Sequence, residues 1–144
     1  FVVKKLSYIL KKSTLLNKQV GFIMVDVDDF KKINDRLGHN VGDLVLKRLS
    51  SILKKVLRDR GFVIRWGGDE FLIIFPTKDT HALSQYIQDL SQGLKEAFEE
   101  IDKNIKISAG IALYPKDALN LEDLIEIADK SMYQCKECRR ATIH

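Results

Sequence analysis

The sequence is poor in the residues that would support a disulfide-stapled or zinc-bound fold. It has two cysteines in 144 residues, Cys135 and Cys138, and they lie close together in an apparent helix. That count fits reduced thiols in the cytosol better than a disulfide framework. The two thiols could supply half of a zinc site, but the sequence holds no second pair with the spacing that would complete it. We therefore do not expect a zinc site there.

Long apolar runs are also missing. No stretch approaches the length needed to span a bilayer, and no signal-peptide pattern opens the chain. We expect a cytoplasmic domain without direct membrane contact, while a tether to a membrane protein in a longer chain stays open. The chain starts at Phe1 inside an apparent helix rather than at a methionine. We therefore expect an N-terminally truncated piece of a longer protein, with a sensory or regulatory domain upstream.

The charge balance lacks a strong excess of either sign. The 24 basic and 20 acidic residues give a net charge of +4, which suits anionic ligands such as nucleotides but does not predict nucleic-acid binding. With 45% hydrophobic residues, the composition excludes disorder and fits one domain over residues 1–144. The lysines near the N-terminus favour a solvated helix face over a phosphate or membrane patch; they are Lys4, Lys5, Lys11, Lys12 and Lys18.

Hydrophobic periodicity predicts an α+β fold. Helical spacing of apolar residues predicts helices near the N-terminus, at 41–57, at 80–101 and from an Asn120 cap to about 135. Short apolar or alternating runs predict strands at 20–25, 62–65, 71–75 and 105–113. Without the terminal helices the order is βαββαβ, a ferredoxin-like or palm-like core with a mainly antiparallel sheet flanked by helices. In that topology the second hairpin strand lies between the first two strands.

The same periodicity predicts which side chains face the core. Helical spacing places Val3, Leu44 and Ile87 inward with their apolar neighbours. In the strand at 105–113, isoleucines, an alanine and a leucine alternate with polar or small residues, which is typical of a half-buried strand.

This topology brings distant acidic residues together. Asp26, at the end of the first strand, must lie beside the hairpin turn that carries Asp69 and Glu70. Carboxylates placed so close repel one another unless a cation neutralises them, and Mg²⁺ prefers such oxygen ligands. Gly67 and Gly68 are expected to bend the turn sharply and to leave room for a bulky ligand.

Asp28 and Asp29 follow Asp26 closely in the sequence. Taken singly, each fits a solvated loop residue as well as a functional one.

Residues 67–71 read Gly-Gly-Asp-Glu-Phe, the signature for which the GGDEF family of diguanylate cyclases is named. Residues 26–35 resemble that family's D-x-D-x-F-K-x-x-N-D segment, and residues 38–43 resemble its G-H-x-x-G-D. Residues 108–112 are similar to its S-x-G-x-A strand and residues 128–133 to its A-D-x-A-L-Y helix. The resemblance covers about residues 1 to 140 with the spacing kept.

The resemblance implies a diguanylate cyclase. Such an enzyme condenses two GTP into cyclic di-GMP and two pyrophosphates, by Mg-assisted attack of each 3′-hydroxyl on the α-phosphate of the other GTP across a homodimer. The family holds two Mg²⁺ or Mn²⁺ ions per half-site, so Asp26, Asp69, Glu70 and the Val27 carbonyl take the metal-binding role here. Glu70 or Asp69 is also implied as the catalytic residue that helps to deprotonate the attacking hydroxyl.

The resemblance also implies which residues bind the nucleotide. Guanine recognition falls to Asn34 and Asp43, although either residue could instead cap a loop. Phosphate contacts fall to the backbone near Phe30, to Lys31, and to a pair of cations at i, i+4 spacing on the last helix. That pair is Lys136 and Arg140. These cations could alternatively serve only the helix dipole.

The sequence departs from the family at the product-inhibition motif. Some family members are inhibited by their own product, and these carry Arg-x-x-Asp just before the signature. This chain has Arg58 at the arginine position and Gly61 at the aspartate position. Asp59 is displaced by two residues and is not expected to substitute. We expect weak or absent cyclic di-GMP binding at this surface. On the last helix the usual glycine and asparagine are also missing, which puts the local shape in doubt.

Two other functions compete with the enzyme. A binding-only signalling module would keep the GTP or cyclic di-GMP site without turnover, and the intact acidic signature argues against it. Another palm-fold nucleotidyl transferase would share the carboxylates but would not be expected to carry the Asn34 and Asp43 pair. Fold alone does not separate these functions.

Overall fold

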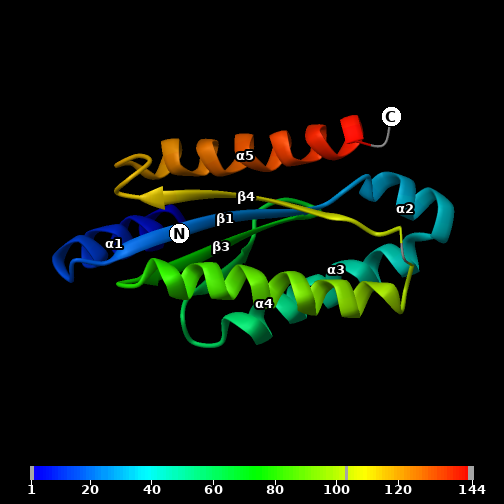
Figure 1. Cartoon of the computed structure of the whole chain (residues 1–144), viewed down its shortest axis with the longest axis horizontal. Coiled ribbons are helices and arrows are strands. Elements are labelled where there is room, and N and C mark those ends of the chain that lie inside the picture. Colours follow the sequence, from blue (N-terminus) through cyan, green and yellow to red (C-terminus); the bar gives the residue numbers. More distant parts are fainter. Residues whose placement is uncertain (1, 103, 143–144) are drawn as a thin grey trace.

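Five helices and four strands make up the described part of the chain, which a computed structural model gives for residues 2–102 and 104–142 (Figure 1). Side chains are described for residues 3–102 and 104–135. The elements in chain order are α1 (Val2–Leu15), β1 (Gln19–Val27), α2 (Phe30–Leu37), α3 (His39–Leu57), β2 (Phe62–Arg65), β3 (Glu70–Thr77), α4 (Thr80–Glu99), β4 (Ile107–Tyr114) and α5 (Leu121–Thr142).

The strands form one sheet in the order β2-β3-β1-β4, and every neighbouring pair is antiparallel. β3, the second strand of the hairpin, therefore lies between β2 and β1. This confirms the α+β fold and the strand order that the βαββαβ pattern predicts.

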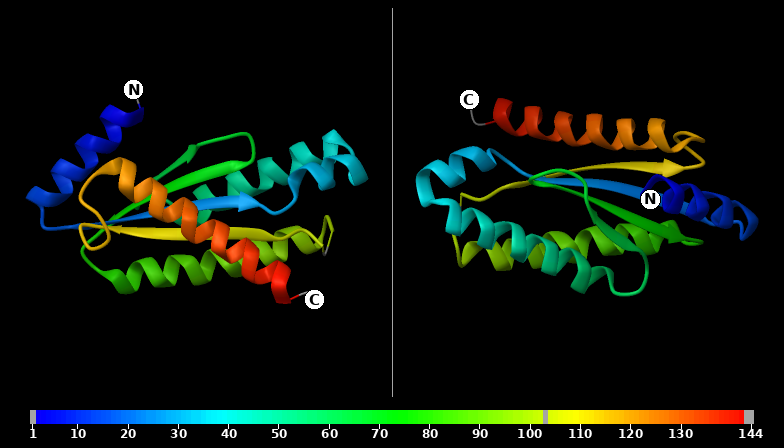
Figure 2. Two further views of the ribbon diagram at one scale, coloured as in Figure 1. Left: turned by 90° about the horizontal axis from the view of Figure 1, so that it is seen from above. Right: turned by 180° about the vertical axis from the view of Figure 1, so that it is seen from behind.

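Helices cover both faces of the sheet, with α1 and α5 on one face and α3 and α4 on the other (Figures 1 and 2). Odd-numbered residues of β1 and β3, such as Ile23 and Ile73, belong to the core under α3 and α4. Even-numbered residues, such as Phe22 and Leu72, belong to the core under α1 and α5. Because successive strand side chains alternate between faces, residue parity tells which layer a side chain enters.

The larger residues of β4 pack against the core under α3 and α4 as expected, since Ile107, Ile111 and Leu113 are partly buried there, but the opposite face of the strand is buried too. Its small residues are fully shielded, since Ser108, Gly110 and Ala112 are buried while Ala109 is exposed. A Cβ on Gly110 would lie 2.1 Å from the carbonyl oxygen of Ala128, so α5 runs almost in backbone contact with β4. Small side chains are buried here because only they allow α5 to approach so closely.

The helix α2 was not expected as a separate element. Phe30, Ile33 and Leu37 recur at the helical spacing i, i+3 and i+7 and pack on one core, so the pattern for this short helix was present and was overlooked. The hydrophobic patterns also placed Val3 and Leu44 inward, and both are exposed in the structure. In α3 Leu46, which the predicted inward set left out, is buried.

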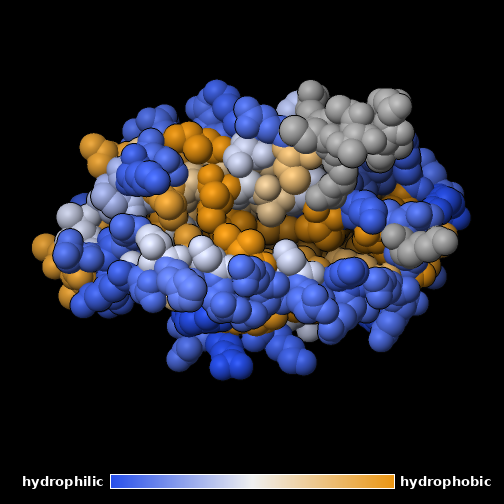
Figure 3. All heavy atoms as spheres, in the orientation of Figure 1, coloured by the Kyte–Doolittle hydropathy of each residue, from blue (hydrophilic) through white to orange (hydrophobic). Residues whose placement is uncertain are grey.

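Ile87 was likewise expected inward and is exposed on α4. It lines an apolar groove between α4 and β4 together with Leu90, Leu94 and Ala109. Figure 3 shows apolar side chains gathered in a band between the polar outer faces of α5 and α4. Ile87 therefore lies at the margin of the core, where its contacts cover it only in part.

The caps and core of the described helices fit their sequence. Asn120 caps α5 as expected, because its side chain accepts a hydrogen bond of 2.8 Å from the backbone amide of Asp123. Tyr86 is fully buried and donates a hydrogen bond of 3.3 Å to the Leu53 carbonyl. Burial raises the pKa of the Tyr86 hydroxyl, and the nearby charge of Arg60 opposes that shift. None of the described helices is long and apolar enough to cross a membrane.

Candidate active site

Asp26 is an acidic residue on a strand face that is otherwise apolar. It is the second-last residue of β1, only 4% exposed, and pairs in register with Glu70 on β3 and Ser108 on β4. Even-numbered neighbours such as Met24 are buried in the apolar layer beneath α1 and α5. Asp26 therefore places a carboxylate on a core-facing row, where a charge is costly unless it has partners.

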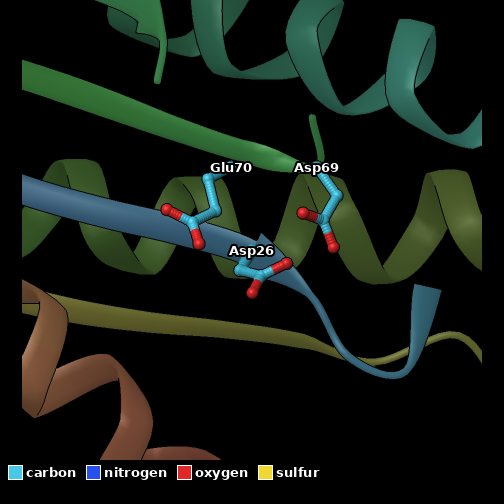
Figure 4. A group of neighbouring side chains, drawn as sticks. All are labelled: Asp26, Asp69 and Glu70. Carbon is cyan, nitrogen blue, oxygen red and sulfur yellow. The ribbon is translucent and has the colours of Figure 1, made fainter. Parts of the chain in front are cut away.

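Three carboxylates converge at this end of the sheet. One oxygen atom each from Asp26, Asp69 and Glu70 can be chosen so that all three lie within 4.8 Å of one another. Figure 4 shows Asp69 and Glu70 reaching from the hairpin toward Asp26 on β1. Residues that are far apart in the sequence thus meet at one point, as the strand order predicts.

The hairpin turn is held by both backbone and side-chain hydrogen bonds. The amides of Trp66 and Gly67 donate to the Glu70 carbonyl at 2.9 and 3.2 Å. The Arg65 guanidinium donates to the carbonyl of Gly67 at 3.4 Å and to that of Gly68 at 2.5 Å. Arg65 thus braces the loop that presents Asp69 and Glu70.

The glycines of this turn were expected to bend it sharply and to leave room for a ligand, and the structure supports the second reason but not the first. Among the described glycines only Gly38 has a positive φ in the left-handed region, so neither Gly67 nor Gly68 needs glycine's backbone freedom. A Cβ on Gly68 would meet no atom within 4 Å, and one on Gly67 would make only ordinary contact at 3.6 Å. The two glycines leave open space beside the carboxylates.

The loop from β1 to α2 runs beside the carboxylates. Asp29 adopts left-handed backbone angles, with φ 52° and ψ 43°, just before α2 begins at Phe30. Its carbonyl accepts hydrogen bonds from the amides of Lys32 and Ile33. The amides of Phe30 and Lys31, in the first turn, precede any intrahelical acceptor, so they are donors of the kind that phosphate oxygens use. The Lys31 side chain is exposed in that same turn.

Comparison with known proteins identifies the relatives of this fold. The sequence model described as "Diguanylate cyclase, GGDEF domain" matches residues 1–142. The chain belongs to the GGDEF family. The crystal structure of the GGDEF domain of TpbB from Pseudomonas aeruginosa superimposes with a TM-score of 0.83 at 29% identity, covering 95% of this chain and 88% of that one.

Curated relatives of this GGDEF domain carry different activities in their names. The cyclic di-GMP phosphodiesterase NbdA of Pseudomonas aeruginosa is 35% identical over 133 residues, which are 91% of this chain and 17% of that protein. Diguanylate cyclase A of Treponema denticola is 29% identical over 133 residues, which are 90% of this chain and 36% of that protein. The chain therefore spans about a third or less of these two relatives.

The expected guanine-binding residues of the GGDEF domain lie on neighbouring helices. Asn34 is inside α2, and its side-chain oxygen is buried without a hydrogen-bond partner among the described residues. A Cβ on Gly42 would lie 1.8 Å from that oxygen, so the amide packs directly on the first turn of α3. Neither Asn34 nor Asp43 caps a helix, because the residues before α2 and α3 are Asp29 and Gly38.

Asp43 is exposed on α3 and lines a pocket of about 510 Å³ between α3 and β2. Leu46, Lys47 and Arg65 also line this pocket, whereas its described lining does not include Asn34. Asn34 and Asp43 thus lie on adjoining helices, and of the two only Asp43 is among the described lining residues of this pocket.

The other expected phosphate ligands lie on α5. Lys136 and Arg140 fall within the bounds of this helix, but their side chains lie outside the described residues. Figures 1 and 2 show the C-terminal end of α5 pointing to the same end of the sheet as α2. The helix therefore runs toward the end that carries the carboxylates.

The stretch before β2 is where the sequence departs from the family motif. Arg58 is exposed and ends α3 with a φ of 59°. A Cβ on Gly61 would lie 2.0 Å from the carbonyl oxygen of Ile74 on β3. Arg60, in contrast, is used within the fold, since its guanidinium donates to the carbonyls of Val56 and Leu57. A side chain at position 61 therefore does not fit this backbone.

Sequence reasoning did not single out two contacts of the GGDEF site. The hydrogen bonds from Arg65 to the hairpin turn could not be predicted from sequence, because one arginine before a turn is common in any sequence. Asp28 was left open as a solvated residue, yet it accepts a hydrogen bond of 2.5 Å from the buried Ser108 hydroxyl. Only the strand register, which brings β4 beside the end of β1, could have indicated that pair.

Proposed function

We propose that this domain is the half-site of a diguanylate cyclase, which binds one GTP and pairs with a second copy to make cyclic di-GMP. The observation that carries the proposal is the meeting of Asp26, Asp69 and Glu70 within 4.8 Å. The names of several relatives support it, among them diguanylate cyclase A and the diguanylate cyclase TpbB, which is 33% identical over 146 residues. The intact Gly-Gly-Asp-Glu-Phe signature supports turnover rather than binding alone.

The donor set fits a hard divalent cation. All three side chains offer carboxylate oxygens, and they lie together at a partly buried site, where their mutual repulsion favours a cation. We propose Asp26, Asp69, Glu70 and the Val27 carbonyl as the ligands of two Mg²⁺ or Mn²⁺ ions. Such ions, when bound, would offset the negative charge that develops on the phosphate oxygens.

The reaction itself needs little covalent chemistry from the protein. The 3′-oxygen of one GTP forms a bond to the α-phosphorus of the other, and the bond from that phosphorus to the bridging oxygen of pyrophosphate breaks. Glu70 or Asp69 would accept the proton of the 3′-hydroxyl as that bond forms. The same step on the second GTP closes the ring, so two pyrophosphates leave. Catalysis by this chain would consist mainly of positioning and electrostatics.

The remaining proposed roles hold the nucleotide. Asp43 would accept hydrogen bonds from guanine's N1 and N2 protons, which adenine lacks, while the Asn34 amide would address another part of the base edge. The first amides of α2 near Phe30, together with Lys31, would contact phosphate oxygens. Lys136 and Arg140 would add positive charge from α5. These contacts would present the α-phosphate to the opposing 3′-hydroxyl.

The proposal requires two copies of the domain. Each half-site would hold one GTP, so the ring closes only when two domains face each other. We further propose that the domain works in the cytoplasm, where GTP is available, and that a regulatory domain of a longer chain controls the pairing. Binding of cyclic di-GMP at Arg58 is proposed to be weak, because Gly61 replaces the acid of that motif.

A binding-only signalling module is the second candidate. It is favoured by one observation, the 35% identity to a protein named as a cyclic di-GMP phosphodiesterase. In such a protein a GGDEF domain could bind nucleotide without making the product. Sequence similarity does not separate the two candidates, so turnover has to be measured.

The deciding experiment uses the domain fused to a dimeric coiled coil and incubated with GTP and Mg²⁺. Chromatography of the products is expected to show cyclic di-GMP and pyrophosphate. The Asp69→Asn fusion, which keeps the dimer and removes one carboxylate charge, serves as the matched control and is expected to leave GTP unchanged. GTP that binds to the unmodified fusion but persists would favour the signalling module. Absence of GTP binding would contradict the cyclase, and absence of both GTP and cyclic di-GMP binding would contradict the module as well.

A further inference from the structure

Ser108 is a polar residue in a place where packing needs none. It has no exposed surface and lies on the row of β4 that faces α5, together with Gly110 and Ala112. The close approach of α5 explains why residues on this row are small, and alanine would meet that need as well as serine. A buried hydroxyl is costly unless it is hydrogen-bonded. The hydroxyl of Ser108 therefore calls for its own explanation.

That hydroxyl contacts a residue 80 positions away in the sequence. It donates to the Oδ1 atom of Asp28 at 2.5 Å. The backbone amide of Asp28 also donates to the carbonyl of Lys106 at 2.8 Å. Asp28 directly follows β1, whose last residue Val27 pairs with Ile107. The loop after β1 is thus tied to β4 through both the main chain and the side chain of Asp28.

Asp29, the residue after Asp28, adopts a backbone conformation that costs energy. Asp29 is left-handed, with φ 52° and ψ 43°, and its side chain makes no capping hydrogen bond to α2. A non-glycine residue in this region costs on the order of 1 kcal/mol and persists only where its neighbours fix it. A left-handed residue followed by right-handed ones turns successive amides toward one concave side, which suits an anion. A fixed Asp28 supplies the constraint from one side of Asp29.

We propose that the Ser108–Asp28 hydrogen bond is a positioning contact, which holds the loop at residues 28–30 in the shape that receives the triphosphate of GTP. This inference rests on the proposed function and adds residues that act on the substrate through the backbone of that loop. Ser108 does not touch the nucleotide. Its hydrogen bond holds Asp28 in place. Asp28 in turn constrains the backbone at Asp29, so the first amides of α2 keep their direction.

The test compares Ser108→Ala with Ser13→Ala. Ser13 is also a buried serine, but it lies on α1 and so gives a matched control for loss of a shielded hydroxyl. Calorimetry would measure the affinity for a GTP analogue with a methylene bridge between the α- and β-phosphates, in the presence of Mg²⁺. Saturation-transfer NMR would measure the affinity for GMP, because it detects weak binding.

Ser108→Ala is expected to weaken binding of the analogue about tenfold, the size of effect typical of losing a hydrogen bond to a charged acceptor. GMP binding should stay within twofold, which corresponds to about 0.4 kcal/mol, because GMP lacks the β- and γ-phosphates and offers the loop one phosphate in place of three. Ser13→Ala should bind both ligands like the unmodified domain. Equal weakening of both ligands, or an equal loss in Ser13→Ala, would assign the effect to general destabilisation and overturn the proposal.

Two substitutions at Asp28 separate position from charge. Asp28→Asn keeps an oxygen that accepts from Ser108 and is expected to bind the analogue like the unmodified domain. Asp28→Ala removes that oxygen and is expected to match Ser108→Ala. If Asp28→Asn instead loses as much affinity as Asp28→Ala, the carboxylate charge is what matters, and positioning by Ser108 is wrong.

Hydrogen exchange tests the contact without any nucleotide. In the ligand-free domain, Ser108→Ala is expected to speed exchange of the amides at residues 28–33 about tenfold, with no such change in Ser13→Ala. Unchanged exchange of these amides would refute the positioning role of the Ser108–Asp28 contact even if the domain proves to be a cyclase. If the unmodified domain bound no GTP analogue, the proposed function would fail, and the exchange result would still decide whether Ser108 fixes the loop.

Discussion

The two ends of β2 both carry glycine, and the structure gives a different reason for each. Before the strand, a Cβ on Gly61 would lie 2.0 Å from the Ile74 carbonyl, so the backbone of β3 excludes a side chain. After the strand, a Cβ on Gly68 would meet nothing within 4 Å. Gly61 is needed by the packing of the chain itself. Gly68 is not, so its missing side chain serves whatever enters the space beside Asp69 and Glu70.

From this contrast we expect a functional role for the glycine after β2 and a packing role for the glycine before it. The turn after β2 presents carboxylates next to open space. Before β2, Gly61 stands where the family's product-binding motif has an acid, and only glycine fits the backbone there. A side chain added in the turn after β2 should therefore impair chemistry and spare stability. A side chain added at position 61 should do the reverse.

The largest effect is expected from Glu70→Gln, which keeps the shape of the side chain and removes its charge. Cyclic di-GMP synthesis by the dimeric fusion should fall about a thousandfold, because the site loses a ligand charge and a candidate proton acceptor. The melting temperature should change little. Glu99→Gln, at an exposed site on α4, is the matched control and should retain full activity. Activity of Glu70→Gln close to that of the control would remove the signature from the mechanism.

The next effect concerns stability. Gly61→Ala should lower the free energy of unfolding by about 2 kcal/mol, because its Cβ meets backbone that cannot rotate away. Gly93→Ala on α4 is the control, since its Cβ would make ordinary contact at 3.5 Å with Ile52. Urea titration would measure both variants. Equal stability of Gly61→Ala and the unmodified domain would erase the difference between the two glycine sites.

Gly42→Ala tests the proposed guanine site. The new Cβ would displace the Asn34 amide, whose oxygen lies 1.8 Å from that position. GTP affinity is expected to fall about tenfold, as for loss of one hydrogen bond in a specific site. Stability should hold or rise, because alanine favours helix more than glycine does. Calorimetry together with urea titration checks both quantities, and unchanged affinity would separate Asn34 from guanine recognition.

Gly68→Ala should have a smaller effect on chemistry. Its Cβ points into open space, so the free energy of unfolding should hold or rise slightly. Turnover by the dimeric fusion should fall severalfold, because the methyl group takes room beside the carboxylates. Steady-state kinetics would measure this. A variant as active as the unmodified domain would mean that the open space has no part in the reaction.

The smallest effect is expected at Arg58. Because Gly61 removes the acid of the product-binding motif, Arg58→Ala should leave the inhibition of the dimeric fusion by cyclic di-GMP unchanged. A titration of activity with added product would measure it. Tight product binding that disappears in Arg58→Ala would show that the motif works without its aspartate.

The sequence predicted the fold and the carboxylate cluster because both follow from strand order. Once the pattern read βαββαβ, Asp26 had to lie beside the hairpin turn, whatever the details of packing. The burial of β4 was not predictable in the same way. Alternation placed the larger residues of β4 against the core, and this is confirmed for Ile107, Ile111 and Leu113. Close packing of α5 on Gly110 also buries the small residues of the opposite face. Such a contact depends on another helix, so no local pattern reveals it.

The loop after β1 marks the other limit of sequence reasoning. α2 is only eight residues long, so its apolar stripe of Phe30, Ile33 and Leu37 was overlooked, and a left-handed Asp29 has no sequence signal as clear as glycine. The contact between Ser108 and Asp28 joins residues 80 apart and depends on the register of β1 and β4. Local shape around the carboxylates therefore required the structure, while their proximity did not.

The central claim is that Asp26, Asp69 and Glu70 together hold divalent cations at a guanine nucleotide's triphosphate. The most direct test is a crystal structure of the domain grown with Mn²⁺ and the methylene-bridged GTP analogue, in which anomalous scattering locates the metal. The account predicts anomalous peaks within coordinating distance of all three carboxylates and of the analogue's phosphates. Peaks elsewhere, or an analogue bound away from these side chains, would contradict it.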